Sequence, residues 1–278
     1  MPGDAGSEGQ DAVAVGSEPA PRARWRLLRQ GAGAPAWNMA VDEALLRGAD
    51  RRPVLRLYAW SPAALSLGWF QPDEAFDAEA ARAAGAVLVR RLTGGGAIHH
   101  DRELTFSIVA TPGADGYPAD TIEAYRLVHS GLAAALAAVG ARVAPRGEGW
   151  PLSTRPRAAE FCFHDHTALD LVDERERKLV GSAQRRADGR VLHHGSIPLA
   201  VPSLTPLSGS VALAAGREVG WDELADAVVH ALARALDAEL QPDALSAEER
   251  ARAGALAAGY ADPRRRPGAG FAAERRNS

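Results

Sequence analysis

Apolar residues recur at spacings of three and four positions in several stretches of the chain, which is typical of amphipathic helices. Asn38 is a residue type that favours the position before a first helical turn, and Gly140 is a typical residue just after a last turn. The helices predicted in this way cover residues 38–47, 73–84, 121–139, 221–240 and 247–258.

Short runs of β-branched, aromatic and aliphatic residues predict strands between these helices. Ser61-Pro62 separates the first two runs, and Asp188-Gly189 is a favoured hairpin turn between the last two. The predicted strands lie in residues 53–60, 63–70, 86–92, 97–110, 141–145, 161–163, 167–172, 178–186 and 191–199. Strands outnumber helices and many neighbours are joined by hairpins, so we expect an α+β fold with a mixed, largely antiparallel sheet flanked by helices.

The 278-residue length fits one or two domains. Residues 1–23 and 263–278 are poor in aliphatic side chains, so we expect disordered tails around one folded domain over residues 24–262. A net charge of −3 provides no general attraction for nucleic acid, and no apolar run reaches the roughly 18 residues that span a membrane. One cysteine and an N-terminus unlike a secretion signal favour the reducing cytoplasm.

The basic residues are unusual, because 31 of the 32 are Arg and Lys178 is the single Lys. Such a bias replaces Lys by Arg wherever charge alone matters, so a surviving Lys indicates a site where Arg cannot serve. An ammonium group is compact and its pKa can be tuned, whereas a guanidinium is planar and permanently charged. Chance in a biased composition is the alternative explanation.

Gly94, Gly95 and Gly96 lie between two predicted strands and lack the endings of known phosphate-binding motifs. Without Cβ atoms, their backbone N–H groups can approach a ligand carbonyl, carboxylate or phosphate. Arg90 and Arg91 just before them would add positive charge for an acyl-carrier phosphate or an adenylate. A plain flexible hairpin turn is the alternative.

Cys162 has two interpretations, a small buried side chain or a nucleophile. A nucleophilic thiol needs a nearby cation to lower its pKa, and Lys178 could supply it or hold a developing oxyanion. The clustered histidines, such as His99-His100 and His193-His194, match no ordinary zinc spacing, and no serine lies in a nucleophile elbow, so we expect neither a metal site nor a serine hydrolase.

Taken together, the segments RRLTGGGAIHHDRELTFSI, WNMAVDEALL, LSLGWFQ, KLVGSAQRR and HHGSIPL resemble the lipoate/biotin protein ligase and octanoyltransferase superfamily over about residues 25–240. The resemblance implies the fold of the biotin/lipoate protein ligase catalytic domain. It places Lys178 on the superfamily's essential lysine. It also implies substrate-binding residues at Arg90, Arg91, Gly94, Gly95, Gly96, Ala97, His100, His194 and Gly195.

Within the superfamily, HDRELTFS and a Cys-Phe pair upstream of KLVGSAQ are similar to the Cys-dependent octanoyltransferase branch. This resemblance implies that Cys162 accepts an octanoyl group from acyl carrier protein and passes it to a lysine of a lipoyl domain, in dehydrogenase E2 subunits or the glycine cleavage H protein. It implies a monomer that needs no cofactor. His194 could shuttle a proton.

Gly96, where that branch often carries Arg, keeps an ATP-dependent lipoate–protein ligase as an alternative. A ligase would use ATP and Mg²⁺ to form an acyl-adenylate, held by Arg91, the glycine loop and Lys178, and Cys162 would be dispensable. A non-catalytic homologue that binds acyl groups or lipoyl domains is a third hypothesis, and retention of both Cys162 and Lys178 argues against it.

Overall fold

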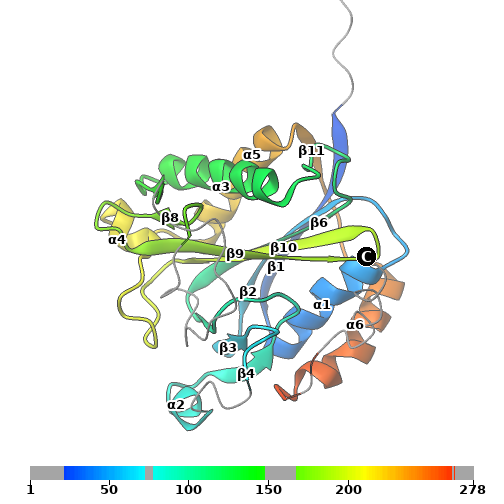
Figure 1. Ribbon diagram of the computed structural model, residues 1–278, viewed down its shortest axis with the longest axis horizontal. Coiled ribbons are helices and arrows are strands. Elements are labelled where there is room, and N and C mark those ends of the chain that lie inside the picture. The colour runs from blue at the N-terminus through cyan, green and yellow to red at the C-terminus, as the bar shows by residue number, and fades with distance from the viewer. Residues whose placement is uncertain (1–21, 73–77, 148–166, 265, 267–278) are drawn as a thin grey trace, which may run out of the picture.

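An eight-stranded sheet crosses the molecule (Figure 1) in the order β11-β1-β2-β6-β10-β9-β8-β7. The computed structural model describes residues 22–72, 78–147, 167–264 and 266. The β11–β1 and β1–β2 pairs are parallel and the other pairs are antiparallel, which confirms the expected α+β class. The strands are β1 Ala23–Gly33, β2 Val54–Trp60, β6 Glu103–Ala110, β7 Ala144–Pro145, β8 Leu171–Val172, β9 Lys178–Ala187, β10 Arg190–Pro198 and β11 Ala238–Pro242.

Helices cover both faces of this sheet (Figure 1). On one face, α3 (Thr121–Ala138) and α5 (Trp221–Ala235) pack through Val128, Leu132 and Val228 into the larger core cluster. On the other, α1 (Pro35–Arg47) and α6 (Ala247–Tyr260) enclose a second core with the sheet. Two short helices, α2 (Ala78–Ala83) and α4 (Val211–Ala215), complete the set among the described residues.

A second, three-stranded sheet has the order β4-β3-β5 and consists of Val87–Arg90, Ala64–Leu67 and Ile98–His100. The expected turn at Ser61-Pro62 is where the chain passes from the large sheet into this one. The Gly94–Gly96 loop joins β4 to β5. The predicted β9–β10 hairpin is confirmed, and both Asp188 (φ 52°) and Gly189 (φ 70°) adopt the left-handed conformation that such a turn requires.

The structure corrects two boundaries. Asn38 does not cap the first helix, which begins three residues earlier at Pro35, and its amide instead donates to the Ala59 carbonyl at 2.9 Å. The predicted helix over residues 221–240 ends at Ala235, because Asp237 turns left-handed (φ 46°) and the chain continues into β11. Pairing with β1 outweighs the helical pattern there.

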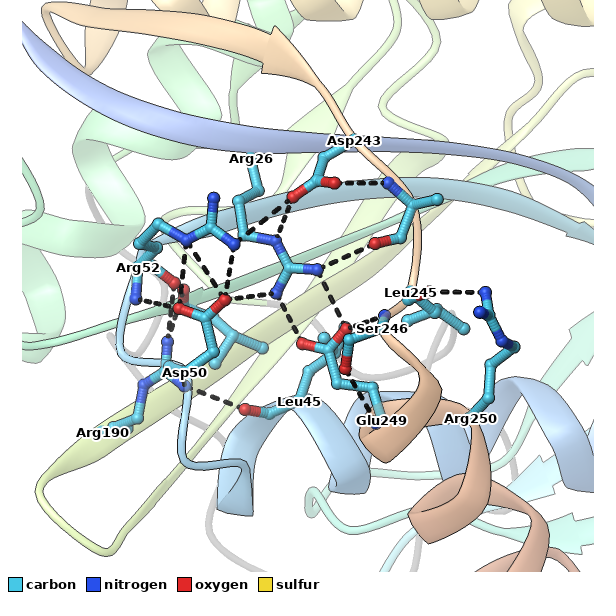
Figure 2. A network of polar contacts seen from close by, with 12 residues as sticks. Arg26, Leu45, Asp50, Arg52, Arg190, Asp243, Leu245, Ser246, Glu249 and Arg250 are labelled. Carbon is cyan, nitrogen blue, oxygen red and sulfur yellow. Dashed lines mark hydrogen bonds and ion pairs between the residues drawn. The ribbon is translucent and has the colours of Figure 1, made fainter.

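Strand β1 is missing from the sequence prediction because its arginines obscure the alternation of apolar residues. Arg26, 3% exposed, lies in a network of ion pairs shown in Figure 2. Its guanidinium binds Glu249 of α6 at 2.5 Å and Asp243 after β11 at 2.6 Å. The hydrogen bond to Glu249 raises the pKa of Arg26 despite its burial. The network ties the edge of the sheet to α6.

Several predicted segments fall outside the described residues: most of both tails, the start of the helix over residues 73–84, and the strand over residues 161–163. In the described part of the C-terminal tail, the Pro263 carbonyl accepts a hydrogen bond from Arg90 at 2.8 Å. Within the described ranges, no helix is both long and apolar enough to cross a membrane. Those same ranges contain no group of three or more His, Cys, Asp or Glu side chains arranged to hold a metal ion.

Candidate active site

A pocket lies where the centre of the large sheet meets the small sheet and α1. Its apolar walls come from Met39, Tyr58, Trp60, Ile98 and Ala183. Four of the lining residues were predicted from the sequence as substrate-binding: Arg91, His100, His194 and Gly195. The full lining comprises Met39, Tyr58, Trp60, Ser66, Arg91, Ile98, His100, Thr105, Ser182, Ala183, His194, Gly195 and Ser196. The mixture of apolar walls and a few polar groups suits an acyl chain that ends in a carbonyl.

His194 is held at the pocket wall by groups on both ring nitrogens. The Asp42 carboxylate beside Nδ1 can only accept, so Nε2 is the unprotonated nitrogen of the neutral ring; Nε2 accepts from the Thr93 hydroxyl at 2.7 Å, and the oxygen of that hydroxyl accepts the Arg91 Nε–H at 3.1 Å. The other nitrogen, Nδ1, then carries the proton and faces Asp42 at 3.4 Å. Burial lowers the pKa of His194 more than the Asp42 carboxylate raises it, which favours a neutral imidazole.

Asp42 contacts four polar side chains, and three of them belong to residues other than the pocket-lining His194. It lies on α1, 1% exposed, and accepts hydrogen bonds from Arg56 at 2.7 Å, Tyr58 at 3.0 Å and Ser107 at 2.9 Å, besides facing His194. Burial alone would raise the pKa of Asp42, but the charge of Arg56 and the contact with His194 outweigh it and lower the pKa. The sequence prediction did not include Asp42. A carboxylate on the apolar face of the predicted first helix is the feature that could have indicated it.

His100 is a second anchored imidazole among the residues that line the pocket. Its Nδ1 lies 2.9 Å from Glu103, its Nε2 lies 2.8 Å from the Ser66 hydroxyl, and its ring stacks on Trp60 with 4.1 Å between centroids. Glu103 also accepts hydrogen bonds from Trp60, Thr105 and Ser196. This web of bonds gives the pocket a rigid wall.

Arg91 shapes the glycine loop. Its guanidinium donates to the carbonyls of Ser66 at 2.8 Å, Gly94 at 2.6 Å and Gly96 at 2.8 Å. Arg90 similarly donates to the carbonyls of Gly68 and Gln71, both at 2.8 Å. Both arginines therefore donate to backbone carbonyls, and the bonds of Arg91 hold the glycine loop beside the pocket. Gly94 packs against Phe70, while Ala97 is buried at the start of β5.

The glycine loop lies directly against Gly68, where a Cβ atom would overlap the Gly95 carbonyl oxygen. We therefore expect Gly68→Ala to displace the loop, to lower stability by about 1–3 kcal/mol, and to reduce any activity of the pocket by about tenfold or more. Urea unfolding and a rate assay measure the two effects. The control is Gly31→Ala, whose new Cβ meets nothing within 4 Å. Equal behaviour of the two variants would contradict this loop geometry.

Gly195 lies on β10 beside His194, and at this position too the structure leaves no space for a side chain. A Cβ atom there would come within 2.6 Å of Phe106 Cε1 and 2.7 Å of the Gly181 carbonyl. Gly195 therefore lets two strands and an aromatic ring meet at the pocket wall.

Lys178 begins β9 and is 4% exposed. Its ammonium lies 3.1 Å from the Asp170 carboxylate, which is 6% exposed in its side chain. Lys178 is not among the side chains that line the pocket, although Ser182 and Ala183 of the same strand are. Cys162 lies outside the described residues, so its roles as nucleophile and as partner of Lys178 stay predictions.

Three buried histidines make stability depend on pH. Burial is the largest influence on each, and it lowers the pKa of His129, His193 and His194 below the ordinary 6.5. As the pH falls through 6.5, the unfolded chain binds protons that the folded chain does not, so the free energy of unfolding must fall. We expect the free energy of unfolding, measured by urea, to drop between pH 7.5 and 5 by up to about 1.4 kcal/mol per pH unit for each histidine. His193→Gln should reduce this slope, and a midpoint independent of pH would refute the expectation.

The chain is similar to a known protein family and to several named proteins. The family model described as the lipoyl protein ligase A/B catalytic domain matches residues 34–248. A protein named octanoyltransferase LipM from Kyrpidia tusciae is 40% identical over 264 residues, which is 85% of this chain and 96% of the relative. Another with that name, from Symbiobacterium thermophilum, is 38% identical over 84% of this chain and 93% of its own length.

Solved structures agree in fold. A crystal structure of lipoate-protein ligase A bound with ATP superposes with a TM-score of 0.69 at 25% identity, covering 88% of this chain and 98% of the other. A putative lipoate protein ligase from Thermoplasma acidophilum with bound lipoic acid gives a TM-score of 0.69 at 23% identity, over 85% of this chain and 95% of the other.

Proposed function

Because the chain belongs to the lipoyl protein ligase A/B catalytic domain family, we propose that it is an octanoyltransferase of lipoate biosynthesis. The observation that carries the proposal is its 40% identity, over nearly the whole of the relative, to a protein named octanoyltransferase. The ligases of known structure resemble the chain at lower identity, and a pocket with apolar walls serves either activity. Sequence kinship therefore favours the transferase over the ligase.

The proposed reaction has two balanced steps. In the first, the Cys162 thiolate attacks the octanoyl thioester on acyl carrier protein, forming a new thioester and releasing the carrier thiol. In the second, the amine of a lysine on a lipoyl domain attacks that thioester, forms an amide and returns the thiolate. One thioester replaces another and amide formation is downhill, so the scheme needs neither ATP nor a metal. The acceptors would be E2 lipoyl domains or the glycine cleavage H protein, in the cytoplasm, with the enzyme acting as a monomer.

The attacking amine must lose a proton, and His194 is the group we assign to receive it. Asp42 sets the tautomer that leaves Nε2 as the basic nitrogen, and burial keeps the imidazole neutral by lowering its pKa. The Thr93 hydroxyl, bonded to that nitrogen, could relay the proton. Lys178 would stabilise the Cys162 thiolate and the developing oxyanion. The glycine loop, His100 and Gly195 would enclose the acyl group.

Intact-mass spectrometry after mixing the protein with octanoyl-acyl carrier protein, without ATP, tests the proposal. We expect a hydroxylamine-sensitive octanoyl adduct on the parent protein and none on Cys162→Ala. Modification of a lipoyl domain only when ATP and free acid are supplied, with no adduct, would establish the ligase instead. Inactivity with every donor despite binding of the acyl carrier protein would favour the non-catalytic homologue.

A further inference from the structure

A chain of buried side chains runs from Tyr117 to the carbonyl of Leu169. The Tyr117 hydroxyl lies 3.1 Å from His193 Nδ1. His193 Nε2 lies 3.0 Å from the Ser182 hydroxyl, which in turn lies 2.7 Å from His129 Nε2. His129 Nδ1 completes the chain at 2.5 Å from the Leu169 carbonyl oxygen. These residues come from β9, β10, α3 and two loops, so the chain links separate elements.

Every hydrogen bond in this chain has one possible direction once the histidines are neutral. A carbonyl only accepts, so His129 Nδ1 carries the proton and His129 Nε2 is an acceptor. Ser182 must then donate its single proton to His129, and it accepts from His193 Nε2–H. His193 Nδ1 is left to accept from the Tyr117 hydroxyl. Burial lowers the pKa of both His129 and His193, in agreement with neutral rings.

The part of this hydrogen-bond chain that runs from Ser182 through His129 to Leu169 connects the pocket with the Lys178 ion pair. Ser182 lines the acyl pocket. Leu169 immediately precedes Asp170, which accepts the Thr167 backbone N–H at 2.7 Å and pairs with the Lys178 ammonium at 3.1 Å. His129 therefore holds the turn over residues 167–170 against α3 at one nitrogen and holds a pocket residue at the other.

We propose that His129 is a positioning residue for Lys178: its hydrogen bond to Leu169 fixes the turn that carries Asp170, and Asp170 fixes the ammonium. The proposal rests on the proposed transferase function. Lys has four rotatable bonds and loses side-chain entropy when it is held in one place, so a buried partner on a fixed turn keeps the ammonium aligned. His129 is not among the residues that line the pocket, and its bond to Ser182 is its link to them.

Two substitutions separate the two bonds of His129. The Asn amide can take the place of Nδ1–H, so His129→Asn keeps the donor to Leu169 and loses the acceptor for Ser182. His129→Phe keeps a ring and loses both. We expect His129→Phe to lower kcat of octanoyl transfer about 10- to 100-fold with KM for octanoyl-acyl carrier protein changed less than threefold, and His129→Asn to restore most of kcat. His230→Phe, at an exposed position of α5, is the matched control and should match the parent.

Lys178 is the only lysine in the chain, so lysine labelled with ¹³C gives one side-chain Cε signal that reports its environment without any assay. We expect this signal to move in His129→Phe in the same direction as in Asp170→Asn, and to stay near the parent position in His129→Asn. If His129 had a merely structural role, the melting temperature of both variants would fall alike, and the Lys178 Cε signal would not differ between His129→Phe and His129→Asn.

An unmoved signal in folded His129→Phe, or equal losses of kcat in the two variants, would overturn the proposal. If the parent protein forms no octanoyl adduct, the proposed function fails by itself. The labelled-lysine measurement still decides whether His129 positions Lys178.

Discussion

Lys178→Arg is expected to lower the rate of octanoyl transfer by about 10²–10³-fold while leaving the fold intact, the loss typical of removing one oxyanion-stabilising donor. Arg can still pair with Asp170, so burial and net charge are preserved. Its planar, bulkier head would displace the positive charge from the place where a compact ammonium stood. The measurement is the initial rate of lipoyl-domain modification, with unfolding curves to verify stability.

The matched control for that substitution is the neighbouring Arg177→Lys, which keeps a cation beside Asp173 and should retain full activity. If Lys178→Arg works as fast as the parent protein, the single lysine reflects chance in an arginine-rich chain. Lys178 would then be only a structural partner of Asp170.

Arg56→Met is expected to destabilise the protein by about 3–5 kcal/mol, because it leaves the Asp42 carboxylate buried without its cation. Both side chains are almost completely buried, at 1% and 2% exposure, and the pair is joined at 2.7 Å. Urea unfolding followed by far-UV circular dichroism measures the change as a shift in midpoint at constant slope. His194 should lose its orientation at the same time, since Asp42 faces it.

Arg52→Met provides the comparison for the Arg56 substitution. Arg52 pairs with Asp50 at 2.7 Å, but its side chain is 62% exposed, and exposed pairs contribute about 1 kcal/mol or less. Similar losses for the two variants would show that burial does not decide the strength of these ion pairs, contrary to the argument given for Asp42.

Local patterns in the sequence were sufficient for the elements whose neighbours lie close in the chain. The helix over residues 121–139 and the Asp188-Gly189 hairpin were predicted correctly, because apolar spacing and turn chemistry act over a few residues. The order of the family's motifs likewise predicted the superfamily. Edge strand β11 was missed, because its parallel partner β1 is more than two hundred residues away.

Patterns within the sequence were enough to establish the α+β class, the glycine loop, the single lysine and the family to which these belong. The packing of the elements was needed to show that Arg91 binds the glycine loop, that Asp42 orients His194, and that His129 lies between the pocket and the Lys178 pair. These contacts join residues up to 152 positions apart in the case of Asp42 and His194. Their partners are chosen by how sheets and helices pack, and no local pattern of residues records that choice.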